Sequence, residues 1–168
     1  MLPLLATERF RLRPLAASDS PWIALLHANP AVMRHIPSHS DPTPQSDPRL
    51  GYWAIENPGP PAIHGWIALK RLSGTQSSEI GFRLFPQSWG RGVATEAAAR
   101  VLRYAFEEAT LHRCVAVCHE NNLVSIRVIR KLGLRFEATF TDATGNWLNY
   151  AITADQWHSR PTRPTTPS

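Results

Sequence analysis

Long apolar segments are absent from this sequence. No run of hydrophobic residues approaches the roughly 18 that a membrane-spanning helix needs. The first apolar stretch, Leu2 to Ala6, is too short for the core of a signal peptide and has no basic residues before it. We therefore expect a cytoplasmic protein that does not enter a membrane.

Cysteine is scarce, and the histidines are poorly placed for a metal. The only two cysteines, Cys114 and Cys118, are spaced C-x-x-x-C, which matches no common redox or zinc motif. On a strand they would point to the same face, so we expect two small buried residues. None of the seven histidines form an H-x-x-x-H pair on one expected helix, and His35 and His39 are separated by Pro37. The sequence therefore predicts no bound metal.

The overall composition is typical of a folded domain. Hydrophobic residues make up 43% of the 168 residues, which suits one compact domain. The net charge of +5 fits an anionic ligand, RNA-rich surroundings or acidic peptides, and does not choose among them. We expect a domain over residues 1–157 and a disordered tail, rich in Pro and Thr, over residues 158–168.

The first half of the chain shows alternation and turn signals. Glu8 to Leu15 alternates apolar residues with arginines and closes at Pro14, which predicts an edge-type strand. Helices are expected over "WIALLHA" (22–28) and "PAVMRHI" (30–36). The proline-rich segment 37–50 is expected to be a loop, either a mobile flap or a plain connector. Short turn-rich links then predict an antiparallel meander of three strands, Gly51–Glu56, His64–Arg71 and Glu79–Phe85.

Helices and strands alternate in the second half. A helix with one small apolar face is expected from about Gly92 to Glu108, followed by an apolar strand over 113–119. A second helix is expected over 121–133 and should end at Gly133. Its inward-facing residues should be Val124, Val128, Ile129 and Leu132. A hairpin around "DATG" completes the chain. The order βααβββαβαββ predicts an α/β or α+β fold with one mixed, mostly antiparallel twisted sheet flanked by helices.

A glycine-rich stretch, "PQSWGRGVATEA" (86–97), stands where a strand meets a helix. Glycines there let a ligand approach the backbone, and free N–H groups at the positive end of a helix favour a phosphate. A nucleoside-triphosphate loop would need a lysine after the second glycine, and a dinucleotide fingerprint would need Gly or Ala where Thr95 stands. A third pattern, Q-x-x-G-x-G, is met by Gln87, Gly90 and Gly92.

This third pattern resembles the acetyl-CoA pyrophosphate loop of the GNAT superfamily of N-acetyltransferases. Its surroundings resemble the branch that contains the ribosomal-protein-alanine N-acetyltransferases, in the stretches "TERFRLRPL", "EIGFRLFPQSWGRGVATEA" and "ENNLVSIRVIRKLGLRFE". The resemblance runs in matching order from residue 5 to about residue 157. Three departures stand out. Leu134 replaces the usual Phe, Asn146 lies where a carboxylate is common, and the loop 37–50 is shorter and richer in proline than the usual substrate-side helix. The resemblance therefore does not identify the substrate of this protein.

The resemblance implies that a bound amine attacks the thioester of acetyl-CoA directly, without a metal. A backbone N–H on the strand 79–85 would hold the oxyanion. Ordinary roles stay open for several residues: a tight turn for Gly90 and Gly92, packing beneath the loop for Trp89, which we favour, and a helix cap for Asn122. The cofactor-binding residues that the resemblance implies are Phe82, Arg83, Leu84, Gln87, Trp89, Gly90, Arg91, Gly92, Val93, Ala94, Asn122 and Ser125.

Two residues are candidates for moving protons. Ser125 matches the serine near the CoA sulfur and would pass a proton to the thiolate, or else bond the backbone at the helix entry. Glu79 is the favoured general base, acting through a water, or else a strand-end surface carboxylate. Glu56 and Glu137 are weaker alternatives for the base. Glu96 is interpreted as a partner of the helix dipole.

The expected function is acetyl transfer from acetyl-CoA to a primary amine. With the resemblance to the ribosomal-protein-alanine branch, a protein or peptide N-terminus is favoured. The base would then have modest work, because that amine titrates near pH ~8 against ~10.4 for lysine. A small amine, an amino acid or an antibiotic is an alternative acceptor. A CoA-binding module without catalysis is an alternative function. RNA binding is at most accessory, because no aromatic-and-basic motif specifies it. A monomer or a homodimer is expected.

Overall fold

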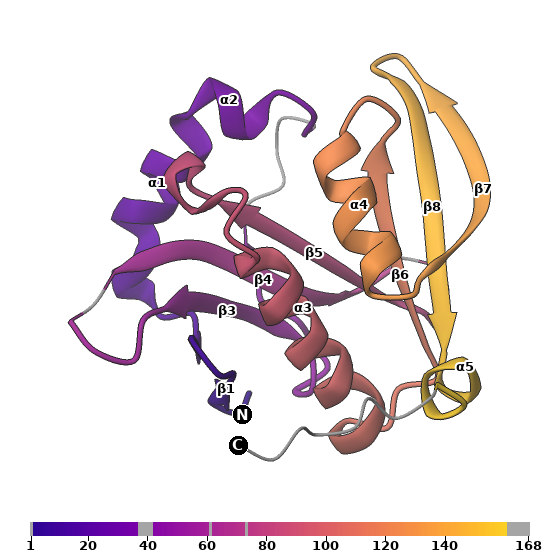
Figure 1. Cartoon of the computed structure of the whole chain (residues 1–168), viewed down its shortest axis with the longest axis horizontal. Coiled ribbons are helices and arrows are strands. Elements are labelled where there is room, and N and C mark those ends of the chain that lie inside the picture. The colour runs from indigo at the N-terminus through magenta and orange to yellow at the C-terminus, as the bar shows by residue number, and fades with distance from the viewer. Residues whose placement is uncertain (1, 37–41, 61, 73, 161–168) are drawn as a thin grey trace.

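A single mixed sheet organises the computed structural model, which describes residues 2–36, 42–60, 62–72 and 74–160. Its eight strands lie in the order β1-β2-β3-β4-β5-β6-β8-β7. Helices lie on both faces of the sheet, and α3 and α4 lie side by side on one of them (Figure 1). This is the mixed, mostly antiparallel sheet flanked by helices that the sequence predicted.

The N-terminal half of the sheet is an antiparallel meander. It is built from β1 (Leu5–Ala6), β2 (Arg11–Pro14), β3 (Gly51–Glu56), β4 (Ile63–Arg71) and β5 (Ser78–Leu84). The three predicted meander strands are confirmed almost to the residue. The prediction of an edge strand over residues 8–15 was wrong, because β2 pairs with β3 on one side and with the short β1 on the other.

The C-terminal half contains β6 (Arg113–His119), β7 (Arg135–Asp142) and β8 (Gly145–Thr153). The predicted hairpin of β7 and β8 is confirmed, and β8 inserts between β6 and β7. The two halves meet where β5 runs parallel to β6, but only two register pairs join them, Ser78 with Cys114 and Glu79 with Val115. Beyond these pairs the strands diverge (Figure 1).

Two apolar cores lie on the two faces of the sheet. On one face, α3 (Val93–Arg103) and α4 (Leu123–Lys131) cover the larger core. On the other face, α1 (Ser20–Ala28) and α2 (Pro30–Met33) cover a smaller core of Leu26, Val32, Tyr52, Trp66 and Ala68. Short 3-10 turns cover Ala17–Asp19 and Pro86–Ser88, and a π-helical turn, Tyr104–Glu108, extends α3. None of the helices in the described ranges is both long and apolar enough to span a membrane.

The predicted inward faces are mostly confirmed. The alanine-rich face of α3 is buried, as are Cys114 and Cys118 on β6. Burial raises the pKa of these two thiols to about 12 and about 11, so both are uncharged structural residues. For α4 the prediction was wrong at Val124, which is 62% exposed, while Ile126 is buried. Residues two positions apart on a helix, such as Val124 and Ile126, differ by about 200° around its axis. A buried face centred on Ile126 and Ile129 therefore turns Val124 outward.

The chain ends were less predictable. A short helix that the sequence analysis missed, α5 (Ala154–His158), follows β8 and begins with a capping box from Thr153. Arg160 lies over the Trp157 ring at 4.5 Å and donates to the carbonyl of Leu132. The rest of the expected tail, 161–168, lies outside the described residues. The same holds for residues 37–41 of the expected loop; the remainder of that loop carries Asp47, which pairs with Arg49 and Arg71.

Candidate active site

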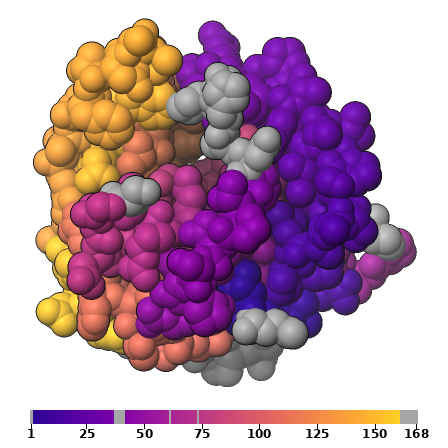
Figure 2. Space-filling model, turned by 180° about the vertical axis from the view of Figure 1, so that it is seen from behind, coloured from indigo at the N-terminus to yellow at the C-terminus, as the bar shows by residue number. Residues whose placement is uncertain are grey.

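The divergence of β5 from β6 opens a cleft of about 410 Å³. Seen from behind, the surface is hollowed between the orange C-terminal hairpin and the violet N-terminal helices (Figure 2). The cleft brings together five of the site residues that the sequence analysis predicted: Glu79, Phe82, Arg83, Asn122 and Ser125. They come from β5 and from the start of α4, so the split in the sheet is what assembles the site.

Strand β5 presents a free backbone edge to this cleft. Its Phe85 N–H donates to the His64 carbonyl at 2.9 Å, and the register pairs Arg83 with Trp66. Because antiparallel strands alternate the direction of their backbone groups, those of Phe82 and Leu84 point away from β4, toward the cleft. The Leu84 carbonyl accepts a bond from the Trp89 indole at 2.9 Å. The N–H groups of Phe82 and Leu84 therefore point away from β4, as a backbone donor to an oxyanion on this strand would have to.

The Arg83 side chain lies on the opposite face from α3. It is buried, and its guanidinium carbon lies 4.9 Å from the centre of the Trp66 ring. The neighbouring Phe82 instead packs partly against the larger core. Arg83 thus belongs to the side of the cleft that α1 and α2 cover.

The glycine loop has the backbone shape that the sequence suggested. Gly90 and Gly92 have φ angles of +71° and +76°, in the left-handed region that favours glycine. The first backbone bond of α3 runs from the Glu96 N–H to the Gly92 carbonyl at 3.0 Å. Within the described parts of the chain, the N–H groups of residues 90–95 consequently have no backbone acceptor. Six successive N–H groups without a backbone acceptor, at the positive end of a helix, are an arrangement that favours an anion.

The side chains around this loop differ in their exposure to solvent. Gln87 and Arg91 are exposed, whereas Val93 and Ala94 are buried and leave only their backbone for a ligand. The preference for Trp89 packing beneath the loop was wrong, because Trp89 is 44% exposed. Its indole N–H already finds an acceptor on β5, so the ring lies across the outside of the loop root.

Glu96 does more than face the helix dipole. Its carboxylate accepts bonds from the Thr7 hydroxyl at 2.6 Å and from the Arg9 backbone and side chain at 2.9 and 2.7 Å. Burial alone would raise the pKa of Glu96, but these hydrogen bonds outweigh it and lower the pKa. Arg9 also donates to the Arg91 carbonyl at 3.1 Å. The N-terminal segment is thereby fastened to the loop and to the first turn of α3.

The start of α4 supplies two polar groups to the cleft. The Asn122 side-chain oxygen accepts a bond from the Ser125 backbone N–H at 3.2 Å, so Asn122 is the helix cap that the sequence analysis considered. Its amide nitrogen has no partner among the described residues. The Ser125 hydroxyl likewise has no hydrogen-bond partner in the described chain, and it is half-buried at the cleft wall. Both groups are available to a ligand.

Among the candidate bases, Glu79 is the one that lines the cleft. It pairs with Lys70 of β4 at 3.3 Å and its side chain is 19% exposed. Glu56 is buried between Arg11 and Arg13, with its nearest contact at 2.5 Å. Glu137 lies on β7 and pairs with Arg113, which lowers its pKa. Neither of these two carboxylates borders the cleft.

The lining of the cleft includes aromatic residues that the sequence analysis did not predict as site residues. Tyr52 and Trp66 meet edge to face at 5.4 Å, and Phe140 stacks with Trp147 at 6.5 Å. His35, at the end of α2, stacks with His119 of β6 at 5.6 Å, and burial followed by the charges of Arg34 and His119 lowers its pKa. In the sequence these residues stand among buried residues, a pattern that is typical of a hydrophobic core. No sequence signal therefore indicated that they line a site.

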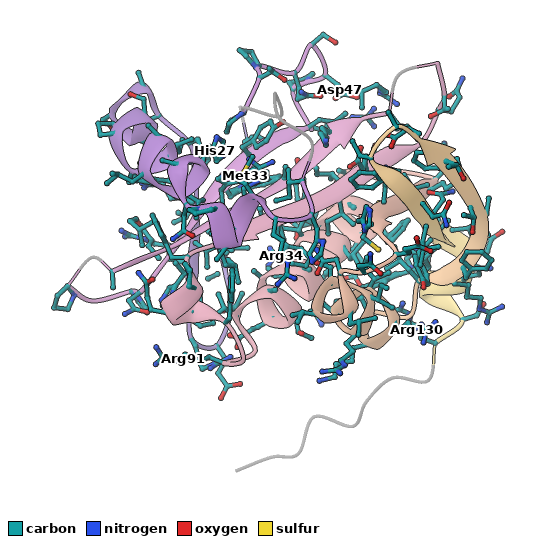
Figure 3. The ribbon with its side chains drawn as sticks, turned by 90° about the horizontal axis from the view of Figure 1, so that it is seen from above. His27, Met33, Arg34, Asp47, Arg91 and Arg130 are labelled. Carbon is teal, nitrogen blue, oxygen red and sulfur yellow. The ribbon has the colours of Figure 1, made fainter. Side chains whose placement is uncertain are left out.

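Basic side chains are spread over the molecule. Figure 3 shows Arg91 beside the start of α3, Arg34 near the centre, and Arg130 on the outer side of α4. Arg127, Arg130 and Lys131 of α4 are exposed. No group of three or more His, Cys, Asp or Glu residues is placed to hold a metal among the residues that the structure describes, and His39 lies outside them.

Comparison with known sequences gives a consistent family. The family model described as an acetyltransferase (GNAT) domain matches residues 9–135. The chain is 37% identical over 100 residues to an uncharacterised N-acetyltransferase of Bacillus subtilis, YnaD, in a match that covers 56% of this chain and 59% of that protein. It is 29% identical over 185 residues to the FsC-acetyl coenzyme A-N(2)-transacetylase of Aspergillus fumigatus, covering 92% of this chain and 78% of that protein.

Solved structures share the fold. A GNAT-family acetyltransferase from Bacillus anthracis superposes with a TM-score of 0.77 at 24% identity, covering 91% of this chain and 99% of that one. The spermidine N-acetyltransferase from Vibrio cholerae, crystallised with CoA and spermine, superposes with a TM-score of 0.75 at 17% identity, covering 89% and 98%. At these identities the likeness establishes the architecture.

Proposed function

The chain belongs to the GNAT family of acetyltransferases, and on that basis we propose that it transfers an acetyl group from acetyl-CoA to a primary amine. The observation that carries the proposal is the cleft between β5 and β6, because it contains a free strand edge and two candidate proton-transfer groups, and because β5 leads directly into the glycine loop with its free N–H groups. Each of these parts answers one requirement of acyl transfer.

The residues present fit the cofactor that the family uses. The free N–H groups of residues 90–95, with Arg91 beside them, suit the pyrophosphate of CoA. An added Cβ at Gly90 would meet nothing described within 4 Å, so the loop leaves room for a ligand against its backbone. The Asn122 amide and the strand edge at Phe82 suit the amide-bearing pantetheine arm. When bound, acetyl-CoA supplies the activated acetyl thioester.

Three groups of this chain would then serve the reaction. The N–H groups of Phe82 and Leu84 would stabilise the negative charge that develops on the acetyl oxygen. Glu79 would accept the proton that the attacking amine loses, through a water, while Lys70 keeps its carboxylate in place. The Ser125 hydroxyl, which has no described partner, would donate a hydrogen bond to the departing thiolate and pass it a proton while taking up another from solvent water.

For the acceptor we propose a protein or peptide N-terminal amine, as in the ribosomal-protein-alanine branch. The lower pKa of such an amine, ~8, leaves little work for a carboxylate base. Small amines are the second candidate, because one solved structure with the same fold is named a spermidine N-acetyltransferase.

The first test is calorimetric titration of the protein with acetyl-CoA, with ATP and NAD as controls. Saturable binding of acetyl-CoA alone supports the proposed role of the loop. The second test measures thiol release from acetyl-CoA with peptides of varied N-terminal residue, polyamines, amino acids and aminoglycosides. A folded protein that binds acetyl-CoA and turns over none of these amines would contradict the proposed catalysis.

A further inference from the structure

A chain of three polar side chains, the buried His64 and Ser88 and the half-buried Asn57, lies at the root of the glycine loop, outside the cleft. His64 Nδ1 lies 2.8 Å from the Ser88 hydroxyl, and His64 Nε2 lies 2.9 Å from the Asn57 side-chain oxygen. Ser88 is 2% exposed and His64 9% exposed. Because burying such groups without partners is costly, the two bonds hold these side chains firmly in place.

The proton positions in this chain follow from its chemistry. The Asn57 oxygen can only accept, so His64 carries its proton on Nε2 and donates it to Asn57. Its Nδ1 then carries a lone pair and accepts a bond from the Ser88 hydroxyl. Burial, and then the charges of Arg91 and Arg9, lower the pKa of His64 and favour this neutral form. The Arg9 charge is partly balanced by Glu96, and Phe10 meets the His64 ring edge to face at 5.0 Å.

His64 contacts the loop root at two points. Its backbone carbonyl accepts the Phe85 N–H at 2.9 Å, where β5 ends, and its ring holds Ser88, where the 3-10 turn ends. Within the turn, the Ser88 N–H donates to the Phe85 carbonyl at 2.9 Å and the Trp89 N–H to the Pro86 carbonyl at 3.1 Å. The root is thus fixed from residue 85 to residue 89, and the free N–H groups begin directly after it.

We propose that Asn57, His64 and Ser88 act together as a latch that positions the glycine loop for the CoA pyrophosphate. The proposal rests on the proposed function. His64 and Ser88 line no part of the cleft, and with Arg91 they border a second pocket beside the loop. Because both side chains are buried and bonded to each other, they act as positioning residues through the backbone of Gly90 to Gly92. The latch sets the direction of the loop donors before a ligand arrives, which saves the entropy of ordering them upon binding.

The test compares two ligands that differ in the pyrophosphate. Acetyl-CoA has it, and S-acetylpantetheine lacks the whole nucleotide part. Ser88→Ala removes the hydroxyl that holds His64, and it is expected to weaken acetyl-CoA binding about tenfold, leaving the dissociation constant of S-acetylpantetheine and the kcat at saturating acetyl-CoA unchanged. Ser78→Ala is the matched control, because Ser78 is also a buried serine and its hydroxyl has no partner in the described chain.

A second variant gives a readout that a merely structural role would not move. Asn57→Asp places a carboxylate against Nε2 and stabilises the imidazolium form of His64, in which Nδ1 donates to the Ser88 oxygen, so the bond to Ser88 reverses its direction and the hydroxyl must turn. Acetyl-CoA binding should then weaken as the pH falls, starting at a higher pH than in the unmodified protein. The binding of S-acetylpantetheine should show no such pH dependence.

The outcomes separate the two proposals. If the unmodified protein does not bind acetyl-CoA, the proposed function is wrong and the latch has no role in it. If the unmodified protein binds acetyl-CoA and Ser88→Ala binds it equally well, the function stands and the latch is wrong. If Ser88→Ala loses affinity for both ligands alike, or only in step with a loss of thermal stability, the serine supports the fold in general and the latch is again wrong.

Discussion

Replacing Gly90 by alanine asks directly whether a ligand lies against the glycine loop. Gly90 has a φ of +71°, and a Cβ added there would meet no described atom within 4 Å. The protein itself therefore loses only the strain of a left-handed alanine, about 1–2 kcal/mol. For a chain of this length that corresponds to a fall in Tm of about 2–8 °C.

A bound ligand changes this expectation. If the loop donors contact a pyrophosphate, the added methyl occupies the surface that the phosphate oxygens approach, and the dissociation constant for acetyl-CoA should rise at least about tenfold, or ~1.4 kcal/mol. Gly74→Ala is a matched control. Gly74 has a φ of +74° and equally open surroundings, but it lies in the turn between β4 and β5, at the other end of β5.

The assay is calorimetric titration with acetyl-CoA, together with a thermal melt of each variant. Both variants should lose similar stability, and only Gly90→Ala should lose affinity. If Gly90→Ala binds acetyl-CoA as tightly as Gly74→Ala does, the phosphate does not lie against this loop, and the reasoning from free N–H groups fails.

Three further predictions concern catalysis and stability. Glu79→Gln should lower kcat about 100-fold or more while acetyl-CoA binding stays unchanged, as measured by thiol release and calorimetry; an unchanged kcat excludes Glu79 as the base. Ser125→Ala should lower kcat about tenfold without changing the affinity for acetyl-CoA, and equal activity would remove its role as proton donor. Asp19 has its pKa lowered to about 2, because hydrogen bonds led by that from Arg13 outweigh the effect of burial. Its contribution is therefore present above pH ~4 and is lost as the pH falls toward ~2, so Asp19→Asn should cost about 2 kcal/mol in urea unfolding at pH 7 and little at pH 2.

Local signals account for the parts that the sequence predicted well. The turn residues between β3, β4 and β5 leave no room for a crossover, so an antiparallel meander is the only arrangement that fits. Gly90 and Gly92 stand at a strand-to-helix junction, and both adopt the positive φ angles that the pattern implied. These features depend on neighbours in the chain, which a single sequence displays.

Other features depend on distant partners and could not be predicted. The separation of β5 from β6 follows from how two halves of a sheet twist past each other, and no residue near Gly81 marks it. Trp89 is a large apolar residue of the kind expected in a core, but its indole N–H donates to the Leu84 carbonyl and its ring stays partly exposed to solvent. His64 looked like one of several scattered histidines, because its partners lie 7 and 24 positions away.

The strand edges of this sheet differ in how easily another chain could add to them. Strand β1 is only two residues long, which offers too little backbone for a stable addition. The inner edge of β5 is recessed in the cleft, out of reach of a second sheet. Strand β7 is exposed along its whole length and carries Phe136 and Phe140 on its surface. Self-association at high protein concentration is therefore expected to begin at β7, and Phe136→Lys should suppress it without touching the cleft, which Phe140 lines and Phe136 does not.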